Sequence, residues 1–387
     1  MQVAIVGDYP LDSAHLRGGV EAAFAYLVKG LRQFEDLQVH IITMQSESHM
    51  ESTEIEQDGV ILHLLPGLAR FELARMYRIY QSQLNEILDR IQPAVVHAQG
   101  STYHAYAALK SGSPTVLTVH GVFREDIKYA RNLVIRLRNQ LAALLIERYS
   151  LSHTRHLIAI SRYVATYFSS LLRPETQVYY IPNAIDKSYL NLQDIASGHT
   201  ILFAGRVLPL KRLLDLVKAF EKIIQHFPQA QLRIAGECQS EPAYVKTIRA
   251  FIREAGLHNQ VHLLGSLSEE AVLREFAACD VLALPSAQEN APMVIAQAMA
   301  AGKPVVATPV GGVSGMVSHG ETGFLVDVGD TDGLADALLH LLRDSSLRAR
   351  MGQLGHKFAA ENYHPDIVAK RTYDVYQRIA ASHRQRR

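Results

Sequence analysis

Short runs of apolar and β-branched residues alternate with longer segments of helical periodicity along the whole chain. In the first half these runs occupy 3–7, 39–43, 60–65, 94–99, 115–120, 156–161 and 178–183. After a polar segment at 191–200, the pattern restarts at 201–206, 230–237, 261–265, 280–286, 303–308 and 323–326. Strands that alternate with helices predict a parallel sheet covered by helices. The restart predicts a second sheet of the same kind.

The length of the chain agrees with a division into two domains. At 387 residues, 48% of them hydrophobic and 20% charged, the chain exceeds what one ordinary core accommodates. We predict an α/β fold with two doubly wound, Rossmann-like domains, over 1–188 and 189–365. Because open sheets of this type bind ligands beyond the carboxyl ends of their strands, the cleft between the domains is the expected active site.

Charge and cysteine content exclude several classes of protein. The 39 Lys and Arg residues balance 38 Asp and Glu residues, so bulk electrostatics does not indicate a nucleic-acid-binding protein. Cys238 and Cys279 are too few for a disulfide framework or a cysteine-based metal site. The opening MQVAIVGDYP is typical of a strand rather than a signal peptide, and no apolar run reaches the length of a membrane span. We expect a cytoplasmic protein.

Two glycines follow the first predicted strand. Gly18 and Gly19 lead into a helical pattern, so they would open a helix with bare backbone N–H groups, which suits a phosphate. The alternative is an ordinary flexible turn, because the spacing is not that of a dinucleotide-binding loop.

Two cations follow the first strand of the second half. Arg206 ends that strand, and Lys211 lies across a Pro209 turn just before a helix. Together they can neutralise a diphosphate, the arginine through its planar fork and the lysine as a point charge. The alternative is that both are solvated loop charges.

An acidic residue precedes an apolar helix in the stretch QENAPMVIAQAMAAGKP. Because proline is favoured at the first helical position, we predict that this helix begins near Ala291, with Pro292 in its first turn, and ends at Ala301-Gly302. Glu289 then lies just outside the helix N-terminus. There it could simply interact with the helix dipole, or it could bind sugar hydroxyls and leave the first-turn N–H groups for a phosphate.

Taken together, these motifs resemble the retaining nucleotide-sugar glycosyltransferases of family 4, which have the GT-B fold. The resemblance is carried by Gly18-Gly19, the TVHG stretch that ends in His120-Gly121, YIPNAID at 180–186, AGRVLPLK at 204–211 and the block 261–312. It covers nearly the whole chain. It implies two Rossmann-like domains that face each other across a cleft, and a C-terminal helix near 366–387 that returns to the first domain.

The resemblance implies a role for each matching residue. Gly18 and Gly19 match the loop that approaches the donor phosphate and the acceptor, and His120 matches the histidine that reaches the donor sugar. Arg206 and Lys211 match the diphosphate clamp. Glu289 matches the first glutamate of an E-x7-E motif, which binds the donor sugar. The segment that lies against sugar and phosphate in the family matches Asn290, Ala291, Pro292 and Met293.

The second glutamate of that motif, which usually holds the ribose hydroxyls, is replaced here by Gln297. A carboxylate accepts hydrogen bonds from both hydroxyls. An amide offers one acceptor and one donor group, so it still pairs with two hydroxyls if one of them accepts a hydrogen bond instead of donating it. We therefore expect Gln297 to contact the donor. The alternative is that Gln297 is merely a polar residue on a buried helix and that the site is degenerate.

The implied reaction transfers a hexosyl group from a UDP- or GDP-linked sugar to a sugar or lipid-linked acceptor, in surface polysaccharide or glycolipid synthesis. No cofactor and no metal are expected, because Arg206, Lys211 and the helix end near 292 would stabilise the leaving diphosphate. Asp330-Thr331-Asp332 matches a metal-binding D-x-D pattern, but a helix N-cap at Asp330 explains it. A rival hypothesis is a catalytically weak GT-B protein that binds a nucleotide sugar or a partner glycosyltransferase.

The segment 124–148 predicts a basic amphipathic helix. Its apolar positions are 127, 130, 134, 137, 141 and 144, with basic side chains between them at Lys128, Arg131 and Arg138. Such a helix either packs its apolar face on the first sheet or rests on anionic lipid at the inner face of the membrane. Three further arginines would extend a lipid-binding patch, Arg70, Arg75 and Arg78.

Overall fold

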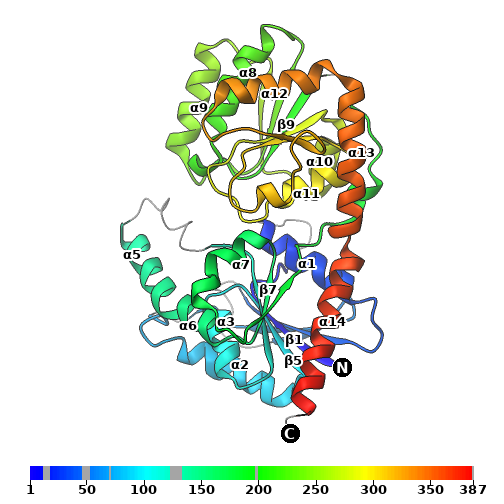
Figure 1. Cartoon of the computed structure of the whole chain (residues 1–387). Helices are drawn as coiled ribbons and strands as arrows, with labels where there is room; N and C mark the ends of the chain where they lie inside the picture. Colours follow the sequence, from blue (N-terminus) through cyan, green and yellow to red (C-terminus); the bar gives the residue numbers. More distant parts are fainter. Residues whose placement is uncertain (12–17, 46–52, 69–70, 123–132, 197–198, 386–387) are drawn as a thin grey trace. The chain divides into compact units, whose positions relative to one another are not determined.

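The computed structural model describes residues 1–11, 18–45, 53–68, 71–122, 133–196 and 199–385, which form two compact units (Figure 1). The first unit comprises Met1–Ala184 and Pro365–Arg387, and the second comprises Ile185–His364. The chain thus leaves the first unit after Ala184 and returns to it at Pro365, where the sequence predicts boundaries at 188 and 365.

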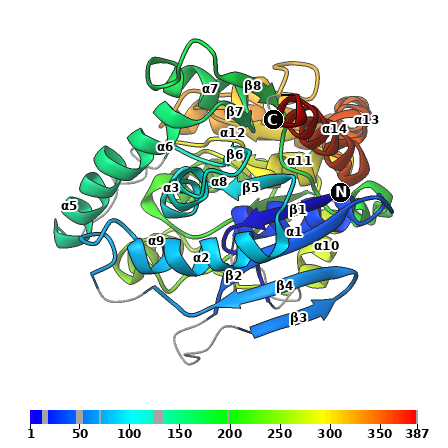
Figure 2. The ribbon, with the colours of Figure 1, turned by 90° about the horizontal axis from the view of Figure 1, so that it is seen from below.

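The first unit is built on an eight-stranded sheet in the order β3-β4-β2-β1-β5-β6-β7-β8 (Figure 2). Only the β3–β4 pair is antiparallel among the described strands. The seven predicted strands are confirmed. The sequence does not predict β3, because all five of its residues are exposed and no buried face marks it. The strands are β1 (Gln2–Val6), β2 (Gln38–Met44), β3 (Thr53–Gln57), β4 (Val60–Leu65), β5 (Val95–Gln99), β6 (Thr115–Val119), β7 (His156–Ala159) and β8 (Gln177–Tyr180).

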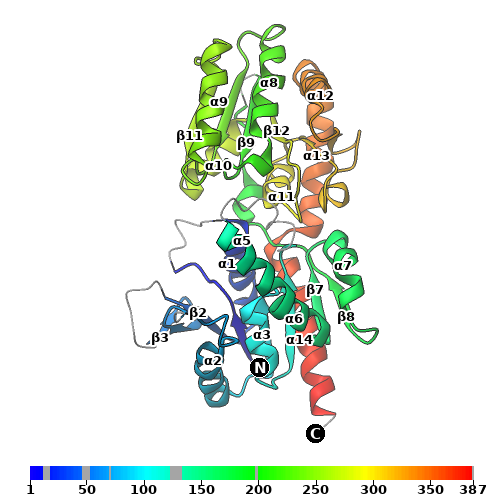
Figure 3. The same ribbon diagram turned by 90° about the vertical axis from the view of Figure 1, so that its left-hand side faces the viewer.

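Helices from both ends of the chain cover this sheet. The C-terminal helix α14 packs against α1, and Gly30 permits the contact, because a Cβ atom there would lie 2.7 Å from the Pro365 carbonyl oxygen. By contrast, α5 lies at the outside of the unit, away from the sheet (Figure 2), on the side that faces the viewer in Figure 3. The helices are α1 (Gly19–Leu31), α2 (Arg78–Ile91), α3 (Tyr103–Lys110), α5 (Leu133–Ala142), the π-helical η1 (Ala143–Glu147), α6 (Arg148–His153), α7 (Arg162–Phe168), η2 (Ser169–Leu171) and α14 (Pro365–Arg384).

The second unit is built on a six-stranded parallel sheet in the order β11-β10-β9-β12-β13-β14. All six predicted strands are confirmed. They are β9 (Thr200–Ala204), β10 (Gln231–Ala235), β11 (Val261–Gly265), β12 (Val281–Leu284), β13 (Val305–Ala307) and β14 (Gly323–Leu325). The helical segments are η3 (Lys187–Asn191), η4 (Pro209–Lys211), α8 (Leu213–Ile224), α9 (Pro242–Glu254), α10 (Glu269–Ala278), α11 (Met293–Ala300), η5 (Val313–Gly315), α12 (Thr331–Arg343) and α13 (Ser345–Asn362).

Each sheet contains one point at which the strand order reverses. In the first sheet the chain proceeds outward from β1 in one direction and from β5 in the other, and in the second sheet the same reversal lies between β9 and β12. At such a switch point the connections leave neighbouring strands towards opposite faces of the sheet. A crevice therefore opens at the carboxyl ends of those strands, and ligands bind there in folds of this type.

The start of α11 differs from the prediction. The helix begins at Met293, and Pro292 is its N-cap, with φ −67° and ψ 116°, rather than a residue of the first turn. The residue before a proline disfavours helical angles, so Ala291 cannot lie inside the helix. The predicted end is confirmed, because Ala301 caps the helix and Gly302 follows with φ +69°.

Several histidines are buried within the strands of the first sheet. His40, His63 and His97 lie on β2, β4 and β5 and are at most 4% exposed. Burial lowers the pKa of His63 to about 4 and that of His97 to about 3, and it also lowers the pKa of His40. These imidazoles are therefore neutral in the folded protein at neutral pH.

We predict that acid weakens the first unit before its carboxylates are protonated. Below about pH 6.5 the unfolded chain binds protons on these histidines while the folded chain does not, so each lowers the free energy of unfolding by up to about 1.4 kcal/mol per pH unit. The loss continues until the folded pKa is reached. Chemical denaturation at a series of pH values from about 7 to 5 measures this slope, well above the unperturbed carboxylate pKa values.

His97→Gln should reduce the slope of the free energy of unfolding against pH by up to about 1.4 kcal/mol per pH unit, the contribution of one proton. The matched control is His153→Gln, because His153 is exposed at the end of α6. Equal slopes in wild type and His97→Gln would contradict the assignment of His97 as a buried neutral group.

Candidate functional site

Three loops meet at the switch point of the second sheet. They follow β9, β12 and β13, which are neighbours in that sheet. The Ala287 N–H donates to the Leu210 carbonyl at 2.8 Å, and the Gly312 N–H donates to the Glu289 carbonyl at 3.2 Å. These backbone hydrogen bonds connect the β12 loop to both of its neighbours, so residues far apart in the sequence share one site.

Glu289 is the centre of this site. Its Oε1 accepts a hydrogen bond from Lys211 Nζ at 2.5 Å and another from Ser286 Oγ at 2.7 Å. The carboxylate is largely buried, whereas the Lys211 side chain is 20% exposed. An ammonium group has three protons, so Lys211 retains donors for a further anion while Glu289 holds it in place. Sequence analysis did not identify Ser286, whose only signal is its position at the end of β12.

Arg206 lies apart from this pair. Its side chain is exposed, and its Nη2 lies 3.5 Å from Ser240 Oγ, on the loop that follows β10. The pKa of the neighbouring Glu237 is lowered by its hydrogen bond to Ser240, and Arg206 contributes to the shift. Arg206 and Lys211 therefore have different partners in the absence of a ligand. To act as a clamp, both side chains would have to contact the same diphosphate.

The N-terminus of α11 opens beside Glu289. No side chain caps this helix, so its first N–H groups remain available, and such a helix end attracts anions. Within the part of the chain that the structure describes, the buried Oδ1 of Asn290 has no hydrogen-bond partner. A buried acceptor without a donor is costly, so this oxygen is suited to a ligand that donates. Ala291, Pro292 and Met293 complete the segment between Glu289 and the helix.

Gln297 lies on the second turn of α11 and is only 8% exposed. The helix packs against α13, and most of its residues are buried. The Gln297 side chain makes no hydrogen bond to another described residue. Gln297 is thus enclosed by the fold while its amide stays uncommitted, which is compatible with a ligand contact and also with the packing alternative.

The acidic Asp330-Thr331-Asp332 segment belongs to α12. Asp330 is the N-cap, and its Oδ1 accepts a hydrogen bond from the Gly333 N–H at 2.8 Å, as predicted. Asp332 lies in the first turn and forms an ion pair with Lys222 of α8. Both carboxylates therefore have structural roles.

In the first unit, Gly18 caps α1, which begins at Gly19 as predicted, without a side-chain cap. Gly18 has φ 175°, an extended conformation that any residue adopts, and a Cβ atom there would meet no atom within 4 Å. Neither the backbone nor packing within the described residues requires a glycine at 18. The backbone at Gly18 is therefore open to close approach by a ligand.

His120 follows β6 at the same edge of the first sheet. Its Nε2 bonds to Gln99 Oε1 at 2.6 Å, and burial lowers its pKa to about 4, although the neighbouring Asn183 opposes the shift. The imidazole is therefore neutral at neutral pH. The sequence pattern does not predict a role for Gln99, the last residue of the fully buried strand β5.

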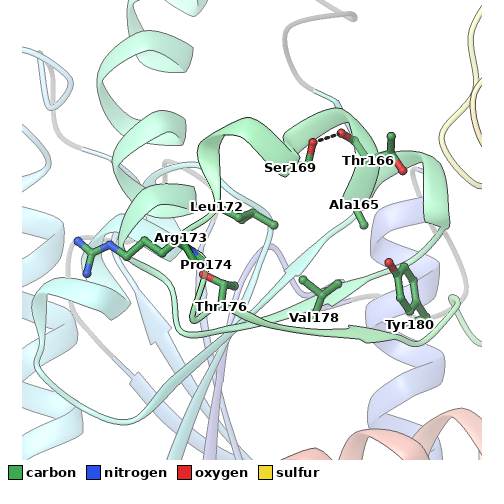
Figure 4. Close-up of a pocket in the computed structure, with 9 residues that line it drawn as sticks. All are labelled: Ala165, Thr166, Ser169, Leu172, Arg173, Pro174, Thr176, Val178 and Tyr180. Atoms are coloured by element: carbon green, nitrogen blue, oxygen red, sulfur yellow. Dashed lines mark hydrogen bonds between the residues drawn. The ribbon is translucent and has the colours of Figure 1, made fainter.

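One groove of the first unit lies elsewhere. It has a volume of about 460 Å³ and lies between α7–η2 and the edge strand β8 (Figure 4). Leu172, Val178 and Tyr180 form part of its lining, and none of the candidate residues does. The groove is therefore separate from the strand-end sites described above.

Family models match both halves of the chain. Residues 17–189 match the model described as Glycosyltransferase Family 4, and residues 195–358 match the model described as Glycosyl transferases group 1. Among curated proteins, an uncharacterised glycosyltransferase of Methanocaldococcus jannaschii is 28% identical over 348 residues, which cover 88% of this chain and 90% of the relative.

Solved glycosyltransferase structures share the whole fold. The sucrose-phosphate synthase of Thermosynechococcus elongatus superposes with a TM-score of 0.82 at 20% identity, over 98% of this chain and 99% of that one. HepE of Anabaena, solved in complex with UDP, gives a TM-score of 0.75 at 20% identity, over 97% of this chain and 100% of that one. With both halves matched by family models and the two-domain fold shared, the chain belongs to the family 4 glycosyltransferases with the GT-B fold.

Proposed function

We propose that this glycosyltransferase moves a hexosyl group from a UDP- or GDP-linked sugar to an acceptor hydroxyl, with retention of configuration, in the synthesis of a surface polysaccharide or glycolipid. The observation that carries the proposal is the ion pair of Lys211 with Glu289 beside the uncapped N-terminus of α11. This arrangement offers a cation and free N–H groups for a diphosphate and a fixed carboxylate for sugar hydroxyls.

In the proposed reaction, the bond between the anomeric carbon and the phosphate oxygen breaks, and its electron pair goes to the diphosphate. The acceptor oxygen forms the new bond to the anomeric carbon, and its proton passes to the departing phosphate oxygen. Lys211, Arg206 and the α11 N-terminus stabilise the negative charge on the leaving group, so the step requires no divalent ion. Glu289 already accepts two hydrogen bonds on one oxygen, which suits it to orient the sugar rather than to form a covalent bond.

Release of nucleoside diphosphate from a panel of UDP- and GDP-linked hexoses tests the proposal. The panel begins with UDP-linked sugars, because HepE, which shares the fold, was solved with UDP. Slow hydrolysis of one donor without acceptor, unchanged by a chelator, is the expected result. Binding of a donor without any release would instead favour the rival hypothesis of a catalytically weak GT-B protein.

Lys211→Met and Glu289→Gln should each lower turnover of that donor by about 100-fold or more. Their effects on nucleoside diphosphate affinity should differ. Lys211→Met removes a positive charge and weakens binding, whereas Glu289→Gln removes a neighbouring negative charge and leaves binding unchanged or tighter. Lys222→Met is the matched control, because Lys222 pairs with the exposed Asp332 in the same unit. Near-normal turnover in both site variants would show that the chemistry lies elsewhere.

Gln297→Glu tests the proposed ribose contact. A carboxylate can accept from both ribose hydroxyls, so we expect tighter binding of the cognate nucleoside diphosphate by about 0.5–2 kcal/mol. The gain should disappear with the 2′-deoxy analogue, which lacks one of the hydroxyls. Calorimetric titration of wild type and variant measures both affinities. Equal affinities together with a large loss of thermal stability would identify Gln297 as a packing residue.

We further propose that the first unit rests on anionic membrane. Four leucines on α5 and η1 are 42–56% exposed, namely Leu137, Leu141, Leu144 and Leu145. Their spacing places them along one side of the helical segment, and the exposed Arg136 and Arg138 lie on the same helix. These leucines do not pack on the sheet, contrary to the packing alternative for 137, 141 and 144. Exposed apolar and basic side chains on one helix favour an anionic lipid surface.

A second segment contributes to this face. Arg75 and Arg78 are exposed, and Arg138 lies close enough to the intervening Tyr77 to oppose the rise in its pKa that burial causes. Lys128, Arg131 and Arg70 lie outside the described residues. No helix of the described residues is long and apolar enough to cross a membrane, so the proposed association is peripheral.

Co-sedimentation with vesicles tests the association. We expect binding to phosphatidylcholine vesicles that contain phosphatidylglycerol and much weaker binding to phosphatidylcholine alone. The double variant Leu137→Ser/Leu141→Ser should bind at least about tenfold more weakly, because two apolar side chains no longer enter the interface. Leu354→Ser, which changes an exposed leucine of α13, is the matched control. Equal binding of all three proteins would exclude α5 as the lipid contact.

A further inference from the structure

A chain of hydrogen bonds runs through the core of the first unit from α14 to His120. Tyr376 Oη lies 2.6 Å from His97 Nδ1, and His97 Nε2 lies 2.6 Å from Thr118 Oγ1 and 3.2 Å from Gln99 Nε2. Gln99 Oε1 lies 2.6 Å from His120 Nε2. The chain thus connects the C-terminal helix with the ends of β5 and β6, where His120 lies.

Water does not compete for these bonds. Tyr376 and His97 are fully buried, and Gln99 is 6% exposed. Burial lowers the pKa of His97 to about 3 and that of His120 to about 4, so both histidines of this series of hydrogen bonds are neutral at neutral pH. In a neutral imidazole one ring nitrogen donates and the other accepts. The hydrogen-bond partner of one nitrogen therefore determines whether the other nitrogen donates or accepts.

The amide of Gln99 gives the chain a direction. Its Nε2 donates to His97 Nε2, which is therefore the unprotonated nitrogen and leaves the proton of His97 on Nδ1, facing Tyr376. Its Oε1 accepts from His120 Nε2, which therefore carries the proton of His120. The lone pair of His120 then resides on Nδ1.

Gln99 is also fixed by packing. Gly7 ends β1 beside it, and a Cβ atom at Gly7 would lie 2.7 Å from the Cβ of Gln99. The glycine leaves the space that Gln99 occupies at the switch point between β1 and β5.

The free end of the chain is the other nitrogen of His120. His120 Nδ1 is buried and has no hydrogen-bond partner among the residues that the structure describes, while the Asn183 side chain lies near the ring and opposes the lowering of the His120 pKa by burial. A small cavity of about 20 Å³, lined in part by Gln99, Thr118 and Asn183, adjoins His120 and has room for one water-sized group. A buried acceptor at a strand-end edge, without a donor from the protein, is suited to a hydroxyl group of a ligand.

We propose that Gln99, held by His97 and Tyr376, is a positioning residue that fixes His120 as the Nε2–H tautomer, so that Nδ1 accepts a hydrogen bond from a hydroxyl of the donor sugar. The identity of the ligand rests on the proposed function, whereas the tautomer does not. In the opposite tautomer, His120 Nδ1 would carry the proton. It would then donate to an acceptor atom of the ligand and could not accept a hydrogen bond from a hydroxyl group.

Nuclear magnetic resonance of the full chain with isotope-labelled histidine tests the tautomers without any ligand. Loss of one signal in His120→Asn and of another in His97→Gln assigns the two rings. We expect the proton of His120 on Nε2 and that of His97 on Nδ1. A proton on Nδ1 of His120 in the wild-type protein would overturn the proposal.

Variants then test whether the hydrogen bonds from Tyr376 through His97 and Gln99 determine the tautomer of His120. Gln99→Met, which keeps the length of the side chain, and Tyr376→Phe should both populate the second tautomer of His120. Tyr373→Phe is the matched control, because Tyr373 lies on the same helix and its hydroxyl bonds to Asp36 outside the chain. An unchanged His120 signal in a folded Gln99→Met protein would overturn the positioning role.

Turnover separates this inference from the proposed function. Gln99→Met should lower kcat for donor hydrolysis about tenfold, the scale of one hydrogen bond, while Tyr373→Phe leaves it unchanged. If no UDP- or GDP-linked hexose is hydrolysed, the proposed function fails and the tautomer result still stands. If the tautomer changes in Gln99→Met and hydrolysis does not, the contact of His120 with the sugar is wrong.

Discussion

The parallel arrangement of the strands is the constraint on which the rest of this molecule depends. Every parallel strand of a sheet ends at the same edge, so loops that are distant in the sequence become neighbours there. In the second unit this edge joins Lys211 with Glu289 across 78 residues, and in the first it joins Gln99 with His120 across 21. The polar groups of both sites lie at these edges because the central parallel strands of each sheet are buried on both faces.

The two edges treat charge in opposite ways. In the second unit, a largely buried carboxylate is matched by a lysine, so the site holds ionised groups that are already paired. In the first unit, burial keeps His97 and His120 neutral, and directional hydrogen bonds replace charge. A paired charge in a partly buried site stays available for an anion, whereas neutral groups discriminate between donors and acceptors. The two edges are thus suited to different chemical groups, the first to neutral hydrogen-bonding groups and the second to anions.

Sequence patterns predicted the strands that are rich in apolar and β-branched residues, the end of α11 and the N-cap at Asp330, because each depends on local composition, periodicity or capping. They missed β3, whose five residues are mostly polar and all exposed. They also placed Pro292 inside α11, because the favoured position of proline was given more weight than its effect on Ala291. The partners Ser286 and Gln99 were also missed. A polar residue at a strand end carries no signal of the side chain that it will meet, since that contact depends on the register of neighbouring strands.

The return of α14 to the first unit has a consequence for the order in which the molecule forms during synthesis. The second unit is an uninterrupted stretch of chain, so all of its strands have been synthesised before Pro365. The first unit lacks the helix that packs on α1 and provides Tyr376 until the second unit has been made, and its two parts must then meet across that intervening unit. The first unit therefore reaches its final packing only after the second unit has been synthesised, although most of its residues precede that unit.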